Sequence, residues 1–359
     1  MRRLLVLFGL FLLMGGAVSA QDVPTRADLV DGWNRIEPGG DTICARGTPY
    51  MFYVREGRSD NLLIDFQGGG ACWNDLTCSE RYGTFDDSIS LTENYDNPAI
   101  NGAGIFNLNN PDNPFADYDI VFVPYCTGDV HLGNSVVTYT DANGDFDLHY
   151  NGYVNAATAL DWAYANFDAP ESVFISGCSA GSIGASFHAP NILAHYDGVR
   201  AAVLGDSAGG YRGYQTTQFE QWNTLSVLPD LEQYADMTLE SLSFQQFWIN
   251  AALQFPGTLF TQYNTAFDET QTYFARISGT GVQYADALPA NLSEIAAQVA
   301  NFATYTAGGE LHCVLPRPEF YTYSVGATSV RDWVADLAAG ETVDTVTCTD
   351  CAVAETVAQ

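Results

Sequence analysis

The pentapeptide Gly-Cys-Ser-Ala-Gly at positions 177–181 constrains the fold more than any other part of this chain. It follows an apolar, β-like run at 172–176 and precedes a helical segment at 182–196, so the pattern is strand, tight turn, helix. Glycines on both sides of Ser179 allow the sharp turn and leave the serine hydroxyl clear at the carboxyl end of the strand. The pattern predicts a nucleophilic serine in an α/β protein.

A second Gly-x-Ser-x-Gly sequence at 205–209 also follows an apolar run and offers Ser207 as an alternative nucleophile. The glycine-rich continuation after it opposes a helix, whereas the segment after Ser179 carries apolar residues suited to one. We therefore favour Ser179 and interpret Ser207 as part of a turn at the end of the next strand.

Residues 1–20 have the pattern of a secretory signal peptide, with two arginines, an apolar run at 4–14 and small residues at 17–20. The apolar run is too short to span a bilayer, which takes about 20 residues. We expect an extracellular or periplasmic chain that begins near Gln21 and has no membrane attachment after cleavage. Residues 21–359 show no repeat or linker and predict one catalytic domain with its core at about 40–340.

Acidic residues dominate the composition, because 43 Asp and Glu residues face 13 basic ones and give a formal net charge of −30. Such a surface repels nucleic acid and anionic membranes, so we expect neither as a partner.

Eight cysteines in an exported chain are expected to form disulfides. Two pairs are close in sequence and are predicted to form, Cys72 with Cys78 and Cys348 with Cys351. Zinc is the alternative at 348–351, but a second ligand pair with suitable spacing is missing. The pairing of the other four cysteines stays open, and these are Cys44, Cys126, Cys178 and Cys313.

Short apolar and β-branched runs alternate with helical segments along the chain. We predict strands at 62–66, 119–124, 173–176, 199–204 and 259–267, and helices at 154–166, 182–196, 239–253, 291–305 and 329–338. This alternation indicates an α/β-hydrolase-like, mainly parallel sheet with helices on both faces and loop insertions. The segment 79–114, rich in Asn, Asp and Gly, is predicted as a surface insertion.

A nucleophilic serine needs a histidine to take its proton and a carboxylate to orient that histidine. In α/β-hydrolases the acid and then the histidine follow the serine along the chain. The histidines on the helix after Ser179 lie away from the carboxyl edge of the sheet, where the reaction is expected. We therefore favour His312 as the base. For the acid we favour Asp268, which ends the strand at 259–267, over Asp206. The alternative for Asp268 is a helix cap, and one residue cannot easily do both.

The glycine-rich segment at 67–70 could supply backbone N–H groups to an oxyanion. This segment and five others occur in the same order as in the pectin acetylesterase and Notum family. The chain therefore resembles that family and is similar to a bacterial member over about residues 40–340. The set comprises the segments 67–73, 124–130, 177–181, 204–207, 267–269 and 311–313.

This resemblance implies an α/β-hydrolase fold with Ser179 as nucleophile, Asp268 as acid and His312 as base. It also implies an oxyanion hole built from the backbone N–H groups of Gly69, Gly70 and Ala180, and a disulfide between Cys72 and Cys78.

The expected activity is that of a serine carboxylesterase acting on acylated carbohydrate, most simply acetyl esters, without a cofactor. An amidase, peptidase or polyester depolymerase with the same triad is the alternative, and a catalytically silent binding protein is a second one. Trp73 and Tyr211 are candidates to stack on sugar rings.

The segment 141–147 partly matches a calcium-binding loop through the side chains of Asp141, Asn143, Asp145 and Asp147. It lacks the glycine placement and the distal Glu of such a loop. Asn143-Gly144 also predicts a type I′ turn in a β-hairpin. We favour the hairpin and predict no metal site.

Overall fold

The computed structural model describes residues 23–213 and 216–357. The predicted signal peptide at 1–20 lies outside the described residues. Among the helices of the described ranges, none has the length and apolar character needed to cross a membrane.

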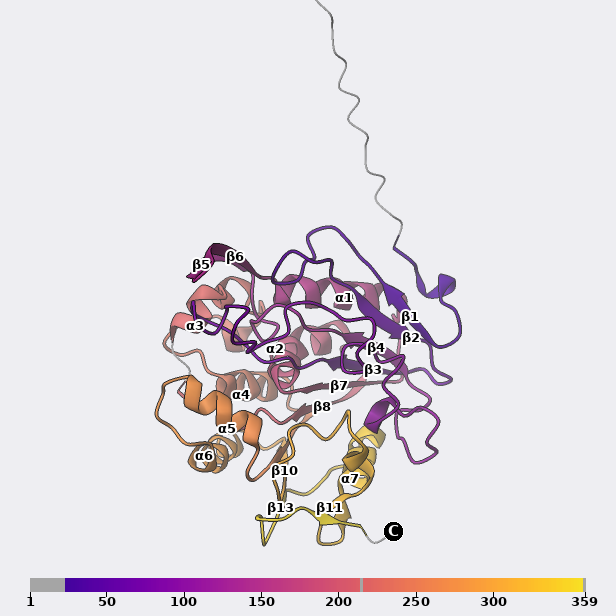
Figure 1. Ribbon diagram of the computed structural model, residues 1–359. Coiled ribbons are helices and arrows are strands. Elements are labelled where there is room, and N and C mark those ends of the chain that lie inside the picture. Colours follow the sequence, from indigo (N-terminus) through magenta and orange to yellow (C-terminus); the bar gives the residue numbers. More distant parts are fainter. Residues whose placement is uncertain (1–22, 214–215, 358–359) are drawn as a thin grey trace, which may run out of the picture.

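A nine-stranded sheet forms the centre of the molecule (Figure 1). Its strands, in spatial order, are β1 (Trp33–Ile36), β2 (Phe52–Arg55), β4 (Asp119–Val123), β3 (Asn61–Phe66), β7 (Ser172–Cys178), β8 (Arg200–Asp206), β9 (Leu259–Thr265), β10 (Phe302–Ala307) and β13 (Val346–Thr347). All pairs from β4 to β13 are parallel, and β2 runs antiparallel to both of its neighbours. The predicted mainly parallel α/β sheet is therefore confirmed.

Helices and loops cover both faces of this sheet. The helices are α1 (Gly152–Asn166), α2 (Ala180–His195), α3 (Thr216–Gln221), α4 (Phe244–Gln254), α5 (Glu269–Ile277), α6 (Tyr284–Ala296) and α7 (Val330–Ala339). On β7, Val173 and Ile175 join a core with α1, α2 and α4, whereas Phe174 joins the opposite core with α7. This alternation follows from the two-residue period of a strand, and it explains why the central strands are apolar throughout.

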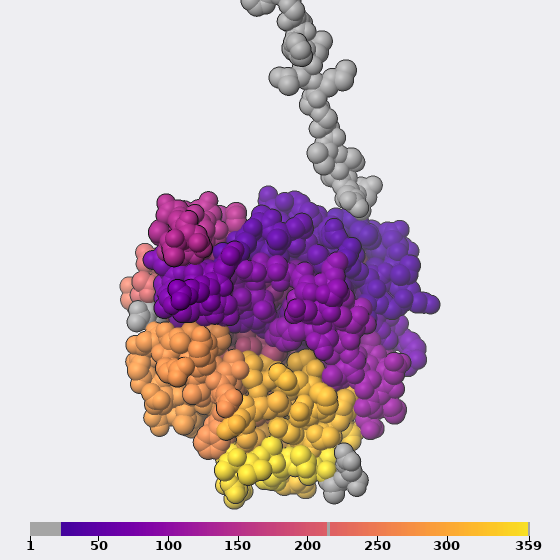
Figure 2. All heavy atoms as spheres, in the orientation of Figure 1, coloured from indigo at the N-terminus to yellow at the C-terminus, as the bar shows by residue number. Residues whose placement is uncertain are grey.

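The N-terminal and C-terminal parts of the chain meet across one face of the molecule. Figure 2 shows residues of the first 150 positions, in indigo to magenta, above residues after about 270, in orange and yellow. Smaller elements complete the fold: a hairpin of β5 (Ser135–Asp141) and β6 (Gly144–Tyr150), a sheet of β11 (Tyr323–Val325), β12 (Thr328–Ser329) and β14 (Glu355–Thr356), and 3₁₀ turns at η1 (Arg26–Asp28), η2 (Gly104–Phe106), η3 (Thr224–Val227), η4 (Glu232–Tyr234) and η5 (Pro318–Tyr321).

The five predicted strands are confirmed as β3, β4, β7, β8 and β9, but the predicted helix at 291–305 is wrong in its second half. α6 begins earlier, at Tyr284, and ends at Ala296, and β10 follows from Phe302. The β-branched and aromatic residues of β10 pair in register with β9, so strand pairing overrides the helical pattern. The predicted insertion at 79–114 holds little regular structure apart from η2 and an isolated bridge at Phe85.

The hairpin predicted around position 143 is confirmed as β5 and β6, but the predicted type I′ turn is wrong. Asp141 pairs with Gly144, so the turn residues are Ala142 and Asn143, one position earlier than expected. Neither has a positive φ, whereas Gly144 has a φ of +119°. Glycine thus takes the unusual conformation after the turn instead of within it.

Candidate active site

Ser179 lies in the tight turn between β7 and α2, where the sequence predicts it. Its backbone has φ 56° and ψ −119°, a conformation that residues other than glycine rarely adopt. The Ser179 N–H donates to the carbonyl oxygen of Asp206 over 2.7 Å, and this bond fixes the turn against the end of β8.

The glycines around Ser179 are required by close backbone contacts. A Cβ atom on Gly181 would lie 1.9 Å from the carbonyl oxygen of Phe66 on β3. A Cβ atom on Gly177 would lie 2.2 Å from the carbonyl oxygen of Gly181. Any larger residue at either position would push α2 away from the sheet.

His312, in the loop after β10, is hydrogen-bonded to Asp268, the residue between β9 and α5. The distance from Nδ1 of His312 to Oδ2 of Asp268 is 2.8 Å, and the Asp268 carboxylate is fully buried. The other oxygen, Oδ1, accepts the N–H of Gln271 over 2.8 Å and so caps α5. The expectation that one residue cannot easily do both is therefore wrong, because the two carboxylate oxygens divide the two roles.

A disulfide between Cys178 and Cys313 brings the neighbours of Ser179 and His312 together. Their Cα atoms lie 5.7 Å apart, although the two cysteines are 135 positions apart in sequence. A ring nitrogen of His312 and the two sulfur atoms all lie within 4.8 Å of one another. The imidazole therefore lies beside the turn that carries Ser179. These sulfurs are bonded to each other, so they do not form a thiolate metal site.

Asp206 and Ser207, the alternatives to Asp268 and Ser179, are fully buried at the end of β8. Oδ2 of Asp206 accepts the N–H groups of Val314 and Leu315 over 2.7 and 2.8 Å, and Oδ1 accepts the Ser207 hydroxyl over 2.8 Å. The Ser207 oxygen in turn accepts the N–H of Cys313 over 3.0 Å. Burial raises the pKa of Asp206 to about 6, and these donors oppose that rise. Neither side chain has a group free to serve an external substrate.

The glycine-rich segment runs directly beside Ser179. A Cβ atom on Gly68 would lie 2.9 Å from Cβ of Ser179. Within residues 23–213 and 216–357, the N–H groups of Gly69, Gly70 and Ala180 donate to no acceptor. Unused N–H groups beside a nucleophile are what an oxyanion hole requires.

His131 supports the start of this segment, and the sequence offered no signal for that role. Its Nε2 lies 2.8 Å from the carbonyl oxygen of Gln67, and its ring is fully buried. Burial lowers the pKa of His131 to about 3, so the ring is neutral at physiological pH and donates from Nε2.

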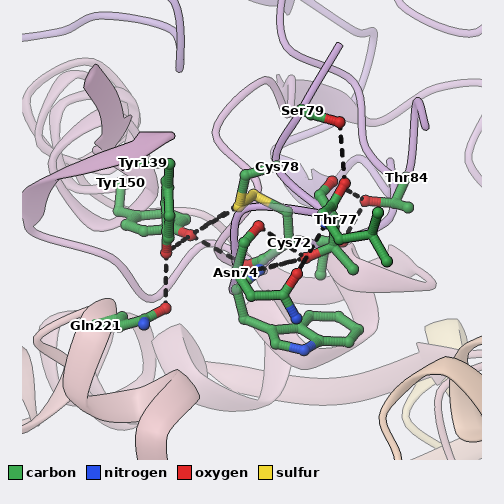
Figure 3. The surroundings of a disulfide bond; sticks show 12 residues. Cys72, Asn74, Thr77, Cys78, Ser79, Thr84, Tyr139, Tyr150 and Gln221 are labelled. Carbon is green, nitrogen blue, oxygen red and sulfur yellow. Dashed lines mark hydrogen bonds between the residues drawn. A yellow bond between two sulfur atoms is a disulfide. The ribbon is translucent and has the colours of Figure 1, made fainter. Parts of the chain in front are cut away.

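Both predicted local disulfides are present, and the open cysteines pair as Cys44 with Cys126 and Cys178 with Cys313. Figure 3 shows the Cys72–Cys78 disulfide beside Tyr150, whose hydroxyl lies 3.6 and 3.2 Å from the two sulfurs. Tyr139 bonds the same hydroxyl over 2.7 Å and donates to Gln221 over 2.7 Å. This network ties the loop after the glycine-rich segment to the β5–β6 hairpin.

Of the two aromatic candidates for sugar stacking, only Trp73 is partly exposed. Tyr211 has an exposed fraction of 5% and packs edge-on against Phe244 and Phe274. Its ring is part of an aromatic core cluster, which corrects its assignment as a stacking surface.

The partial calcium motif does not gather its oxygens around one point. Asp141 accepts the N–H of Asn143, while Asp145 and Asp147 accept hydroxyls of threonines on the facing strand. In the described part of the chain, one group of His, Cys, Asp or Glu side chains has metal-like spacing. It comprises His312 and the two disulfide-bonded cysteines beside it. The carboxylates at 141–147 are explained by hairpin hydrogen bonds.

Comparisons with known proteins show which proteins this chain is similar to. A family model described as Pectinacetylesterase matches residues 36–235, more than half of the chain. The inactive palmitoleoyl-protein carboxylesterase notum1b of Danio rerio is 35% identical over 29% of this chain and 75% of its own length. Palmitoleoyl-protein carboxylesterase notum2 of Xenopus laevis is 29% identical over 45% of this chain and 30% of its own. Pectin acetylesterase 7 of Arabidopsis thaliana is 28% identical over 41% of this chain and 37% of its own. The match thus spans about a third of the frog and plant relatives.

Proposed function

Because the chain belongs to the pectinacetylesterase family, whose relatives named above include carboxylesterases, we propose that it is a serine carboxylesterase that removes acetyl groups from acylated carbohydrate. The observation that carries this proposal is the hydrogen bond between His312 and Asp268 beside the strained turn of Ser179. A buried carboxylate that orients a histidine near a serine in a strand-to-helix turn is the arrangement used for acyl transfer.

In the proposed reaction, His312 takes the hydroxyl proton of Ser179 while the serine oxygen attacks the ester carbonyl. The N–H groups of Gly69, Gly70 and Ala180 stabilise the negative charge on the carbonyl oxygen. His312 then gives the proton to the leaving alcohol and activates a water that releases the acid from Ser179. Asp268 holds the imidazole in the tautomer with its proton on Nδ1.

The proposed setting is outside the cytoplasm, after removal of residues 1–20, with residues 21–359 as one catalytic domain. Four disulfides support an oxidising compartment. A net charge of −30 opposes binding of a polyanionic polysaccharide such as pectin at low ionic strength. An acetylated carbohydrate of low charge therefore suits the proposal better.

Replacing the nucleophile tests the proposal. We expect Ser179→Ala to lower turnover of p-nitrophenyl acetate by at least about 10⁴-fold with an unchanged melting temperature. A fluorophosphonate probe is expected to label the wild-type chain on Ser179, which mass spectrometry of the labelled peptide reports. Acetate release from neutral and acidic acetylated polysaccharides would identify the substrate.

Each alternative has its own outcome in these measurements. Full activity of Ser179→Ala would move the nucleophile elsewhere. A wild-type chain that neither reacts with the probe nor hydrolyses any ester would favour the silent binding protein. Faster cleavage of amides or polyesters than of acetyl esters would favour the other hydrolase classes.

A further inference from the structure

We propose that the second Gly-x-Ser-x-Gly sequence, at 205–209, is a positioning element that holds the loop after His312 so that the imidazole faces Ser179. The inference rests on the proposed function, since it assigns Asp206 and Ser207 a role that acts through His312. It also explains why a sequence that resembles a nucleophile turn lies fully buried one strand away from the nucleophile.

Three consecutive amides of the His312 loop end on this pair of side chains. Ser207 accepts the N–H of Cys313, and Asp206 accepts those of Val314 and Leu315. Cys313 has a φ of +61°, which is unusual for a residue other than glycine, so outside contacts must hold this conformation. Asp206 and Ser207 have no exposed surface, and water therefore cannot replace the lost bonds when either is truncated.

Asp206 also connects the two catalytic segments directly. Its carbonyl oxygen accepts the N–H of Ser179 over 2.7 Å, while its carboxylate holds the loop that begins at His312. A displacement of Asp206 would change the separation of nucleophile and base, and a misplacement of about 1 Å can cost about 10²-fold in rate. Asp206 therefore positions both the serine that gives the proton and the histidine that takes it.

The disulfide between Cys178 and Cys313 does not make these hydrogen bonds redundant. It links the two segments through side-chain bonds, about which the backbone of the loop can still rotate. The three hydrogen bonds donated by the backbone amides of Cys313, Val314 and Leu315 instead fix the peptide planes that follow His312. The disulfide sets the distance between the segments, and Asp206 and Ser207 set the orientation of the loop.

The test compares Ser207→Ala with Ser176→Ala in the full chain. Ser176, on β7, is equally buried, but its hydroxyl donates to the buried Asp65 over 2.5 Å and not to the His312 loop. We expect both variants to lower the melting temperature, and only Ser207→Ala to lower kcat for p-nitrophenyl acetate, by about 10 to 100-fold with KM unchanged. Amide hydrogen exchange at 313–315 is expected to accelerate only in Ser207→Ala.

Asp206→Asn separates positioning from acid catalysis. An asparagine can turn its amide oxygen to the two loop N–H groups and donate its NH₂ to Ser207, so we expect kcat within about 5-fold of wild type. Asp268→Asn, by contrast, is expected to lose about 10⁴-fold, because the histidine tautomer is lost.

Two outcomes would overturn the inference while wild-type activity stands. One is a Ser207→Ala variant with wild-type kcat, and the other is an Asp206→Asn variant as inactive as Asp268→Asn, which would make Asp206 the acid. If Ser207→Ala does not fold, Ser207→Gly removes the same hydroxyl at a φ of +63° that glycine adopts without strain. A wild-type chain without esterase activity would instead remove the proposed function.

Discussion

Gln271 holds the acid of the proposed triad from two sides. Its backbone N–H donates to Oδ1 of Asp268, and its side-chain Nε2 donates to Oδ2 over 2.9 Å, the same oxygen that faces His312. Its side-chain oxygen accepts the N–H of Gly210 over 2.8 Å, so the amide orientation is fixed. A fully buried amide held in this way keeps the carboxylate in place.

We predict that Gln271→Ala lowers kcat for p-nitrophenyl acetate by about 10-fold or more with little change in KM, because Asp268 loses one donor and its fixed orientation. The matched control is Gln245→Ala, which removes a buried amide on α4 that donates to the Tyr211 carbonyl over 2.7 Å. Steady-state kinetics check both variants. Equal losses of kcat in the two variants would show that general packing, and not the support of Asp268, explains the effect.

At the scale of elements, the site depends on how closely α2 approaches the sheet. β7 passes into α2 through Ser179, and the first turn of the helix lies against the carbonyl of Phe66 at the end of β3. Glycine at 181 permits this approach, which brings the glycine-rich segment after β3 beside Ser179. The positions of β7, the Ser179 turn and α2 therefore depend on one another.

We predict that Gly181→Ala destabilises the chain by about 2 kcal/mol or more, because the added methyl group would meet backbone atoms that cannot move separately. Gly257→Ala is the control, since nothing lies within 4 Å of a Cβ atom there and its φ is not positive. The midpoint of urea unfolding measures both. If the two variants have the same midpoint, the close contact with Phe66 does not limit the fold.

At the scale of the whole molecule, burial of ionisable groups makes stability depend on pH. Among the described residues, burial raises the pKa of four carboxyl groups to about 6 or 7, also raises that of Asp96, Asp119 and Asp161, and lowers the pKa of two histidines. The pKa rises to about 7 for Asp65 and Asp86 and to about 6 for Asp129 and Asp206. It falls to about 3 for His131 and to about 4 for His188.

The two sets act in opposite directions on stability as the pH falls. Between their unfolded value near 4 and their folded values of about 6 to 7, the carboxyl groups bind protons only in the folded chain, so acid stabilises the fold. Below about 6.5 the two histidines bind protons only when unfolded, so acid destabilises the fold. Four carboxyl groups outweigh two histidines, and acid also relieves the repulsion from the net charge of −30.

We therefore predict that the melting temperature rises as the pH is lowered from about 8 to about 5. Differential scanning calorimetry measures this trend. Asp65→Asn keeps the shape of one of these groups without its titration, so it is expected to raise the melting temperature at pH 8 and to reduce the slope. A melting temperature that falls over this interval would contradict the prediction.

The sequence alone predicted much of this protein because the deciding information was local. Short apolar and β-branched runs marked β3, β4, β7, β8 and β9, and the glycines at 177 and 181 marked the sharp turn. Chain order then selected His312 and Asp268 as partners of Ser179, and the fold brings His312 to Asp268 and to the neighbour of Ser179.

Tertiary structure decided everything that depends on distances between remote segments. The pairing of Cys178 with Cys313, the support of Asp268 by Gln271 and the burial of Tyr211 follow from strand order and helix packing, which no local pattern encodes. β10 formed where a helix was predicted because β9 offered it a hydrogen-bonding edge. A local pattern specifies the conformation of its own segment, whereas a contact depends on the packing of the whole chain.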